Sequence, residues 1–183
     1  MKNKIALITG ICGQDGSFLA KFLVRKGYKV FGTYRRNSSE NTWRLEYLNI
    51  LDKINLIDID LLEYLRVFNL IKELQPTEIY NLAAQSFVAS SFTNPFYTTN
   101  VNSLAVLNLL ESIKSTNSNI KFYQASTSEM FGDTRKKMQD ENTLFYPQSP
   151  YAISKVYSHY LVKNYRDSYN MKCHAGILFN HES

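Results

Sequence analysis

A tyrosine and a lysine, Tyr151 and Lys155, stand four residues apart in the segment SPYAISKVYSHY. On an α-helix this spacing places both side chains on one face. A free tyrosine, with a pKa of about 10, is a poor base at neutral pH, but a nearby ammonium group favours the phenolate and lowers that pKa. Such a pair can exchange a proton with a hydroxyl or carbonyl group. The alternative is an ordinary helical pair without a chemical role.

Hydroxyl and carboxyl side chains follow an apolar run in the segment YQASTSEMFG. If this run is a strand of a parallel sheet, Ser126, Thr127, Ser128 and Glu129 lie at the carboxyl edge of the sheet, where such folds bind ligands. Hydroxyl groups there polarise an oxygen atom, and a carboxylate there can abstract an acidic C–H proton. A Ser/Thr cap followed by a glutamate in a solvated turn is the alternative interpretation.

Three glycines, Gly10, Gly13 and Gly16, lie between the apolar run KIALITG and an amphipathic segment. The first glycine permits a tight turn, and the second lets a pyrophosphate approach the backbone. The following helix N-terminus contributes unpaired N–H groups and a favourable dipole. In this position the motif predicts a dinucleotide-binding loop rather than a merely structural turn.

The type of dinucleotide is indicated at the end of the second apolar run, in the segment TYRRNSS. An acidic residue there would bind a ribose 2′-hydroxyl, whereas Arg35 and Arg36, followed by Ser38 and Ser39, suit a 2′-phosphate. The pattern therefore favours NADP over NAD. A solvated pair of arginines is the alternative.

The elements that position these residues alternate between strand and helix. Buried-strand patterns cover residues 4–10, 28–34, 53–60, 77–84, 120–126 and 173–179, and helical patterns cover residues 17–27, 61–74, 98–114 and 150–168. Strands separated by helices of this length are parallel, with right-handed crossovers. The predicted fold class is α/β, a doubly wound parallel sheet of the Rossmann-like NAD(P)-binding type. The segments 35–43 and 132–150 are predicted to be loops, and long loops in a compact domain are usually functional.

Length and composition limit the alternatives. The 183 residues, 44% of them hydrophobic, suit one globular domain. The net charge of +5 is scattered, so we expect no nucleic-acid partner. The two cysteines, Cys12 and Cys173, have neither disulfide-scaffold density nor metal-ligand spacing, which indicates a reducing, cytoplasmic compartment and no metal site. The N-terminal apolar run is too short for a membrane span or a signal peptide, so we expect no membrane association.

At this level of detail the chain resembles the extended short-chain dehydrogenase/reductases that modify nucleotide sugars. Within them, the segments GICGQDGS, YRRNSSENT, YNLAAQSFVASSF, FYQASTSEMFG, FYPQSPYAISK and GILFNHES resemble the GDP-mannose 4,6-dehydratase family along essentially the whole chain. The chain departs from that pattern by Cys12 for a threonine, MFG for LYG, Gln148 for an arginine and NVNSLAV for DVDALGT.

The resemblance implies a redox-neutral conversion of GDP-mannose to GDP-4-keto-6-deoxymannose, by oxidation at C4, loss of water across C5 and C6, and hydride return to C6. Tyr151, assisted by Lys155, would take the proton of the sugar 4-hydroxyl, Thr127 would bind the same oxygen, and Glu129 would remove the C5 proton. The alternatives are the same chemistry on another GDP-sugar, such as a GDP-heptose, a sugar-nucleotide epimerase or reductase, and a non-catalytic NADP-binding subunit.

The resemblance also implies two sets of contacts. The NADP contacts are Gly10, Ile11, Cys12, Gly13, Gln14, Asp15, Gly16, Arg35, Arg36, Asn37, Ser38, Asp60, Leu61, Leu82, Ala83, Ala84, Gln85, Ser86, Tyr97, Lys155 and His181. The GDP-sugar contacts are Ser86, Ser126, Thr127, Glu129, Tyr151 and Asn180. Taken alone, Asp60 reads as a helix cap and His181 as a surface histidine.

The family continues beyond NHES into a smaller domain that holds the guanosine. We therefore expect residues 1–183 to form the NADP-binding catalytic domain without the C-terminal substrate domain, to bind NADP, and to dehydrate poorly alone. The family often pairs subunits through two helices, and these correspond to segments 98–114 and 151–165. A homo-oligomer, either a dimer or a tetramer, is expected.

Overall fold

The computed structural model describes residues 4–35, 41–134 and 138–181. Its centre is a six-stranded sheet in the order β3-β2-β1-β4-β5-β6, with every adjacent pair parallel. The strands are β1 (Ile5–Thr9), β2 (Lys29–Tyr34), β3 (Ile54–Asp58), β4 (Glu78–Asn81), β5 (Lys121–Thr127) and β6 (Cys173–Leu178). The predicted strands and the doubly wound parallel class are confirmed.

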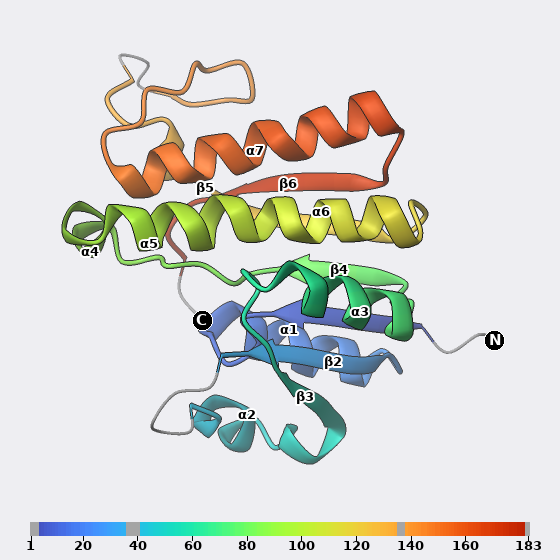
Figure 1. The fold of residues 1–183 in the computed structure, drawn as a ribbon. Coiled ribbons are helices and arrows are strands. Elements are labelled where there is room, and N and C mark those ends of the chain that lie inside the picture. Colours follow the sequence, from blue (N-terminus) through green and yellow to red (C-terminus); the bar gives the residue numbers. More distant parts are fainter. Residues whose placement is uncertain (1–3, 36–40, 135–137, 182–183) are drawn as a thin grey trace.

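Helices cover both faces of the sheet (Figure 1). The long helices are α1 (Gln14–Arg25), α3 (Tyr64–Leu74), α6 (Ala105–Thr116) and α7 (Pro150–Tyr169). Figure 1 shows α3, α6 and α7 side by side over one face, with α1 behind the other. The direction of winding reverses between β1 and β4, and in open α/β sheets ligands bind at this kind of switch point.

The structure differs from the predicted helix over 98–114. That segment is divided among α5 (Pro95–Thr99), a π-helical turn η2 (Asn100–Leu104) and α6, and α4 (Val88–Thr93) precedes them. Pro95 separates α4 from α5, because the residue before a proline, here Asn94, is disfavoured in the helical conformation. A short helix α2 (Trp43–Tyr47) and the 3₁₀ turns η1 (Leu51–Lys53) and η3 (Ser128–Met130) lie in segments without helical periodicity.

Two hydrophobic clusters hold the layers together. Leu7, Ile79 and Phe122 belong to the cluster on the side of α3, α6 and α7, and Ile8 and Val30 belong to the cluster with α1. Since alternate residues of a strand point to opposite faces, β1, β2, β3 and β4 supply both clusters, which explains their nearly continuous apolar runs in the sequence.

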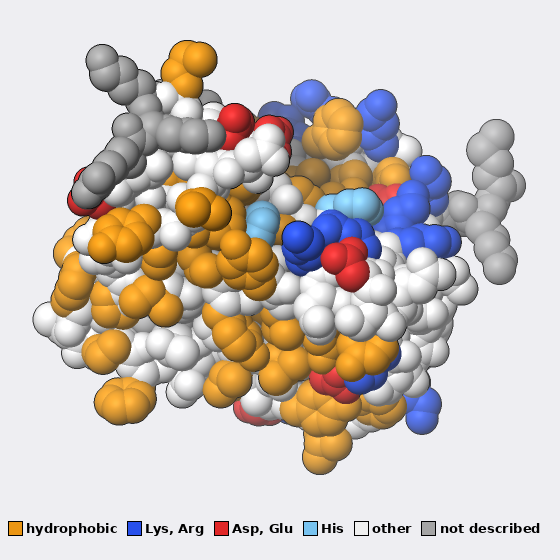
Figure 2. Space-filling view, turned by 90° about the horizontal axis from the view of Figure 1, so that it is seen from above, with side chains coloured by type: hydrophobic (Ala, Val, Ile, Leu, Met, Phe, Trp, Pro, Cys, Tyr) orange, Lys and Arg blue, Asp and Glu red, His pale blue; other side chains and the backbone are white. Residues whose placement is uncertain are grey.

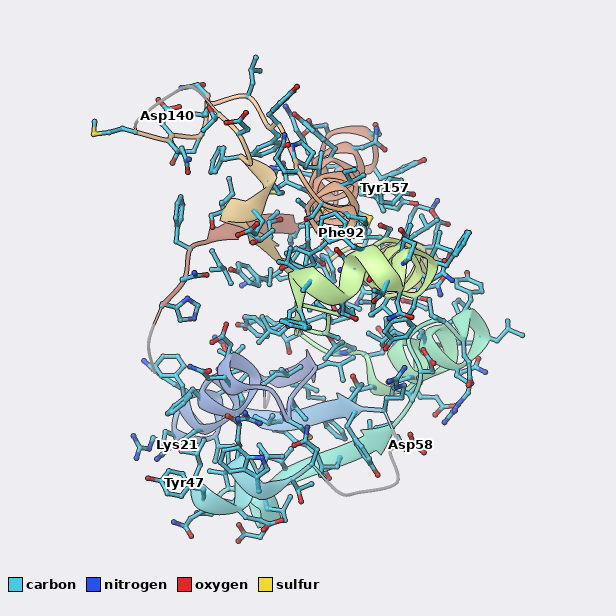
Figure 3. All side chains as sticks on the ribbon, turned by 90° about the vertical axis from the view of Figure 1, so that its left-hand side faces the viewer. Lys21, Tyr47, Asp58, Phe92, Asp140 and Tyr157 are labelled. Atoms are coloured by element: carbon cyan, nitrogen blue, oxygen red, sulfur yellow. The ribbon has the colours of Figure 1, made fainter. Side chains whose placement is uncertain are left out.

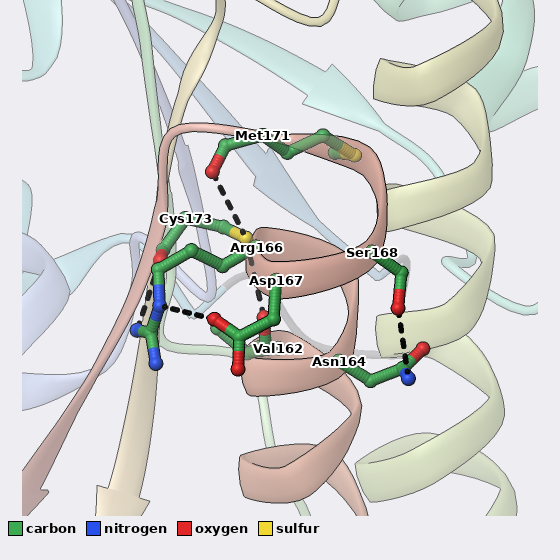
Figure 4. Close-up of polar contacts among 7 residues, drawn as sticks. All are labelled: Val162, Asn164, Arg166, Asp167, Ser168, Met171 and Cys173. Atoms are coloured by element: carbon green, nitrogen blue, oxygen red, sulfur yellow. Dashed lines mark hydrogen bonds and ion pairs between the residues drawn. The ribbon is translucent and has the colours of Figure 1, made fainter.

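The end of α7 is tied to the start of β6 (Figure 4). The Cys173 thiol donates to the carbonyl oxygen of Val162 at 3.3 Å, and Arg166 donates to the Cys173 carbonyl at 3.4 Å. Asn170 ends the helix in the left-handed conformation. Both cysteines are buried and free. These contacts fix the position of α7, which carries the tyrosine and lysine, against the edge of the sheet.

Large hydrophobic side chains are exposed beside α7. Figure 3 shows Phe92 on α4 near Tyr157 on α7, and in Figure 2 hydrophobic side chains gather on the left of the face, with most Lys and Arg to the right. The exposed set on α4, α5, η2 and α7 includes Phe92, Phe96, Leu104, Ile153, Tyr157 and Tyr160. In the described part of the chain, none of the helices has the length and apolar character to cross a membrane.

Candidate active site

A cleft of about 1360 Å³ opens at the carboxyl ends of the strands. It collects most of the predicted site residues from distant parts of the chain. Those that line it are Gly10, Cys12, Gly13, Gln14, Asp15, Gly16, Arg35, Asp60, Leu61, Leu82, Ala83, Ala84, Ser86, Tyr97, Ser126, Thr127, Tyr151, Lys155, Asn180 and His181. The structure thus brings the glycine-rich loop and the Tyr151–Lys155 pair into one cavity.

Three predicted site residues lie outside the lining, as far as the described residues show. The Ile11 side chain is fully buried in the core cluster beside α1, where it packs against Gly32 of β2, so a contact of Ile11 with NADP would be made by its backbone. Gln85 is tied by its backbone to Asn102, and Glu129 is exposed beyond the end of β5. Arg36, Asn37 and Ser38 lie outside the described residues.

Other lining residues were not predicted. They are Thr33, Tyr34, Asn41, Thr42, Glu46, Leu51, Leu56, Ile59, Leu62, Val101, Ala105, Ala125, Leu178 and Phe179. Thr33, Tyr34 and Ile59 could have been found from their places at or just beyond strand ends. The residues from 41 to 51 had no such signal, because α2 is too short to show a helical period.

In the glycine-rich loop, the backbone at Gly10 and Gly16 lies close to other backbone segments. Gly10 has a φ of 68°, in the left-handed region, and an added Cβ would lie 2.8 Å from the Ala83 nitrogen. At Gly16 an added Cβ would lie 2.4 Å from the Gly10 oxygen. Gly13 precedes the first turn of α1, and its side chain-free surface leaves the helix N-terminus open toward the cleft. Unpaired N–H groups at such a terminus favour a phosphate.

Gly10→Ala is expected to destabilise the chain by more than Gly27→Ala. Both glycines have positive φ, but an added Cβ at Gly27 has no heavy atom within 4 Å. Gly27→Ala is the control and measures the backbone strain alone, about 1–2 kcal/mol. Gly10→Ala has the same strain and, in addition, a collision with the backbone that follows β4. Urea unfolding of both variants measures the difference. Equal losses of stability would contradict the close approach of the loop to β4.

The first turn of α7 presents Tyr151 to the cleft. The Ser149 hydroxyl accepts from the Ala152 N–H at 3.0 Å, and Pro150 occupies the first helical position, so the helix starts at a defined residue. Tyr151 is only 7% exposed, yet it lines the cavity, and its hydroxyl is hydrogen-bonded to the Thr127 side chain. The phenol therefore reaches the same space as the glycine-rich loop.

The pKa of the Tyr151 phenol is shifted in the direction opposite to the prediction. Burial has the largest effect and raises the pKa of the phenol, the Thr127 hydrogen bond lowers it, and the negative charge of Glu129 raises it. The prediction that Lys155 lowers this pKa is wrong in this structure. The Lys155 ammonium lies 5.9 Å from the centroid of the Tyr151 ring and donates instead to the Ala125 carbonyl at 3.0 Å.

Lys155 is itself destabilised as a cation. Burial lowers its pKa from 10.5 to about 8, and the described residues include no carboxylate paired with it. Because the folded pKa lies below the ordinary value, the unfolded chain binds more protons between these pH values, and stability rises as the pH increases through this window. Below a pH of about 8 the lysine is charged in both the folded and the unfolded chain, and its burial lowers the free energy of unfolding by the full amount.

Lys155→Met is accordingly expected to raise the free energy of unfolding at pH 7, by on the order of 1–3 kcal/mol. It should also remove the rise in stability between pH 8 and 10.5. Lys163→Met, at an exposed position of the same helix, is the control. It should change neither the free energy of unfolding at pH 7 nor its rise with pH. Denaturant unfolding at several pH values tests this, and a less stable Lys155→Met protein at pH 7 would be the contrary result.

Neighbouring residues complete the polar side of the cleft. The Ser126 hydroxyl lies 3.1 Å from His159 Nδ1, and burial lowers the pKa of that histidine. Glu129 follows in the turn η3, where its N–H donates to the Thr127 hydroxyl oxygen at 3.3 Å. In the described ranges, no group of three or more His, Cys, Asp or Glu side chains could hold a metal ion.

The far side of the glycine-rich loop meets the end of β6. His181 Nε2 lies 3.0 Å from Asp15 Oδ1, and its Nδ1 lies 2.9 Å from the Phe179 carbonyl oxygen. The Asp60 carboxylate accepts from the Leu62 N–H at 2.9 Å, which closes a turn before α3; the N-cap of that helix is Glu63, so Asp60 is not the helix cap expected of it alone. Asn180 lines the cleft between these groups and β6.

Comparisons with known proteins agree with this arrangement. The family model described as GDP-mannose 4,6 dehydratase matches residues 7–183. A GDP-mannose 4,6-dehydratase of Yersinia enterocolitica is 49% identical over 98% of this chain and 50% of its own length. A GDP-mannose 4,6 dehydratase of Homo sapiens is 48% identical over 98% of this chain and 50% of its own length. The chain therefore spans about half the length of these curated relatives.

Solved structures show the same fold at lower identity. The UDP-Glc/GlcNAc 4-epimerase of Campylobacter jejuni has a TM-score of 0.86 and 21% identity, covering 97% of this chain and 53% of its own. The dTDP-glucose 4,6-dehydratase DesIV of Streptomyces venezuelae, solved with NAD bound, has a TM-score of 0.83 and 21% identity, with coverages of 93% and 53%. The sequence match to the family model extends over nearly the whole chain, and the chain belongs to the GDP-mannose 4,6-dehydratase family.

Proposed function

We propose that this chain is the dinucleotide-binding and catalytic part of an enzyme that converts GDP-mannose to GDP-4-keto-6-deoxymannose and water. The observation that carries the proposal is the position of Tyr151, hydrogen-bonded to Thr127 and acted on by Glu129, in the same cleft as the glycine-rich loop. The phenol lies in the cleft for a hydroxyl proton, and the Glu129 carboxylate lies outside the lining but close enough to raise the pKa of that phenol, which supports its role toward a C–H proton. Membership of the family supports the same reaction.

The cleft fits a nicotinamide dinucleotide. The N-terminus of α1 faces it with no side chain at Gly13, and its volume of about 1360 Å³ suits an extended ligand. A nicotinamide dinucleotide bound there supplies the acceptor for the hydride removed from C4 and the donor for the hydride added at C6.

The chain's own residues would handle the protons. Tyr151 takes the proton of the 4-hydroxyl. Thr127 donates a hydrogen bond to the same sugar oxygen and stabilises the negative charge that develops on it. The resulting ketone makes the C5 proton acidic. Glu129 removes that proton and passes it to the 6-hydroxyl, which then leaves C6 as water. The proton that Tyr151 took from the 4-hydroxyl balances the one that C5 regains when hydride adds at C6. Ser86, Ser126 and Asn180, which line the cleft, would contact the GDP-sugar.

We propose NADP rather than NAD as the cofactor. Arg35 follows β2, lines the cleft, and its guanidinium lies 5.4 Å from the centroid of the Tyr97 ring, which orients a cation beside the cavity. Arg36, Asn37 and Ser38, predicted to share this role, lie outside the described residues.

Arg35→Ala should weaken NADP binding about tenfold to a hundredfold, the loss of one charge-assisted hydrogen bond, and change NAD binding by less than about twofold. Arg25→Ala, exposed in the last turn of α1, is the control. Calorimetric titration with both dinucleotides measures the effect. An equal loss for NAD and NADP would argue against a 2′-phosphate contact.

The reaction itself is tested by incubating the complete protein, and residues 1–183 alone, with GDP-mannose and NADP. We expect the complete protein to form the 4-keto-6-deoxy sugar, detected by NMR, and residues 1–183 to form little of it. A product with an inverted C4 and an intact 6-hydroxyl would indicate an epimerase instead. Faster conversion of a GDP-heptose would retain the chemistry and change the substrate.

The proposal includes a homo-oligomer and a cytoplasmic location. Exposed Leu104 on η2 and Ile153, Tyr157 and Tyr160 on α7 support a contact between copies through these helices. The buried free thiols support a reducing compartment. Light scattering of the complete protein tests the assembly, and a monomeric mass would refute it.

A further inference from the structure

Three buried polar side chains stand in one row across the centre of the sheet. Thr9 of β1 is paired with Asn81 of β4, and Asn81 is paired with Gln124 of β5. Each is at most 1% exposed. Polar side chains at such positions cost stability unless they are hydrogen-bonded, so their presence in a row of apolar strands requires an explanation.

The three side chains form one directed chain of hydrogen bonds. The Thr9 hydroxyl accepts from the Ala83 N–H at 3.2 Å and donates to Asn81 Oδ1. Asn81 Nδ2 donates to Gln124 Oε1 at 2.7 Å, and Gln124 Nε2 donates to the Ala125 carbonyl oxygen at 3.0 Å. Reversing any one amide would set two like groups against each other, so each link fixes the orientation of the next.

The chain ends at the carbonyl that receives Lys155. The Ala125 oxygen accepts both from Gln124 and from the Lys155 ammonium at 3.0 Å. Lys155 is 4% exposed and, in the described part of the chain, is paired with no carboxylate, so this carbonyl determines where its ammonium lies. Both ends of the hydrogen-bonded chain, Ala83 and Ala125, line the cleft.

We propose that Gln124 is a positioning residue, which acts with Asn81 and Thr9 to orient the Ala125 carbonyl and through it to hold Lys155 beside Tyr151. This inference rests on the proposed function for its effect on catalysis, but the placement of Lys155 is a property of the fold alone. Tyr151, on the same helix, is the titratable group that faces Lys155.

Gln124→Met keeps the volume and removes both amide links. Without the Gln124 link the Ala125 carbonyl is no longer held toward Lys155, so the ammonium moves toward water, and the smaller desolvation raises the pH at which Lys155 titrates. In the complete protein labelled with ¹³Cε-lysine, we expect the Lys155 NMR titration midpoint to rise by about half a unit or more. The Lys155 signal is assigned with Lys155→Met. This readout does not depend on turnover.

With GDP-mannose as the probe, Gln124→Met should lower kcat about tenfold, the factor for the loss of one ordinary hydrogen bond, with KM changed by less than about twofold. Thr9→Val should give a smaller loss in the same direction, and Thr9→Ser, which keeps the hydroxyl, should restore the wild-type rate. Ser112→Ala, another buried polar deletion that lies on α6 away from the row, is the control.

A folded Gln124→Met protein with the wild-type Lys155 titration overturns the proposal. So does a Thr9→Ser protein that is as impaired as Thr9→Val. If the wild-type complete protein does not dehydrate GDP-mannose, the proposed function fails, and the NMR titration still decides whether the row positions Lys155.

Discussion

Tyr151→Phe is expected to lower the rate of GDP-mannose conversion by about a hundredfold to ten-thousandfold, the range for loss of a positioned acid or base. The substitution removes the hydroxyl and its hydrogen bond to Thr127, and leaves the ring in its buried site. Dinucleotide affinity, measured by calorimetry, should change little, because the glycine-rich loop is untouched. Steady-state kinetics of the complete protein gives the rate.

The control is Tyr157→Phe, on the same helix but exposed and outside the cleft lining (Figure 3). It should retain the wild-type rate. A Tyr151→Phe protein that keeps more than about a tenth of the wild-type rate, with normal stability, would show that the phenol is not the group that moves the 4-hydroxyl proton.

The pH dependence of the rate has a defined direction. Burial raises the pKa of Tyr151 above its ordinary value, so the phenolate is a minor form at neutral pH and the rate should increase as the pH rises. Lys155, with a pKa of about 8, loses its charge at a lower pH than the phenol does. Tyr151→Phe should abolish this increase, which separates the effect of the phenol from that of the lysine.

The strands and the glycine-rich loop could be predicted because their signals are local. A strand buried on both faces must be apolar along its length, as in β1, and Gly10 is required by its φ of 68° and by the close approach of Ala83. The four long helices likewise have enough turns to show a hydrophobic face. These features need no knowledge of distant residues.

Other features depend on tertiary contacts that one sequence does not reveal. The five residues of α2 and the π-helical turn at Asn100–Leu104 are too short for a period to appear. The direction of the Tyr151 pKa was missed because desolvation is set by what packs around the phenol, whereas the four-residue spacing of Lys155 is visible at once. The row of Thr9, Asn81 and Gln124 needs the strand register as well.

Glu129→Gln is expected to block the loss of water while sparing oxidation at C4. The substitution keeps the size of the side chain and removes the carboxylate that we propose takes the C5 proton, so dehydration should fall by about a hundredfold or more. The removed charge has a second effect. Since Glu129 raises the pKa of Tyr151, its neutralisation lowers that pKa, and oxidation at C4 should reach its full rate at a lower pH than in the wild type.

Rapid quenching of a single turnover, followed by mass spectrometry, distinguishes a sugar that has lost hydrogen from one that has also lost water. We expect the first species to accumulate in Glu129→Gln and not in Glu141→Gln, an exposed control in the segment before α7. An epimerase would form no dehydrated sugar in either protein. If Glu129→Gln dehydrates at the wild-type rate, another group removes the C5 proton. If its oxidation step keeps the wild-type pH dependence, the carboxylate does not act on the phenol, and the two halves of the reaction are then independent.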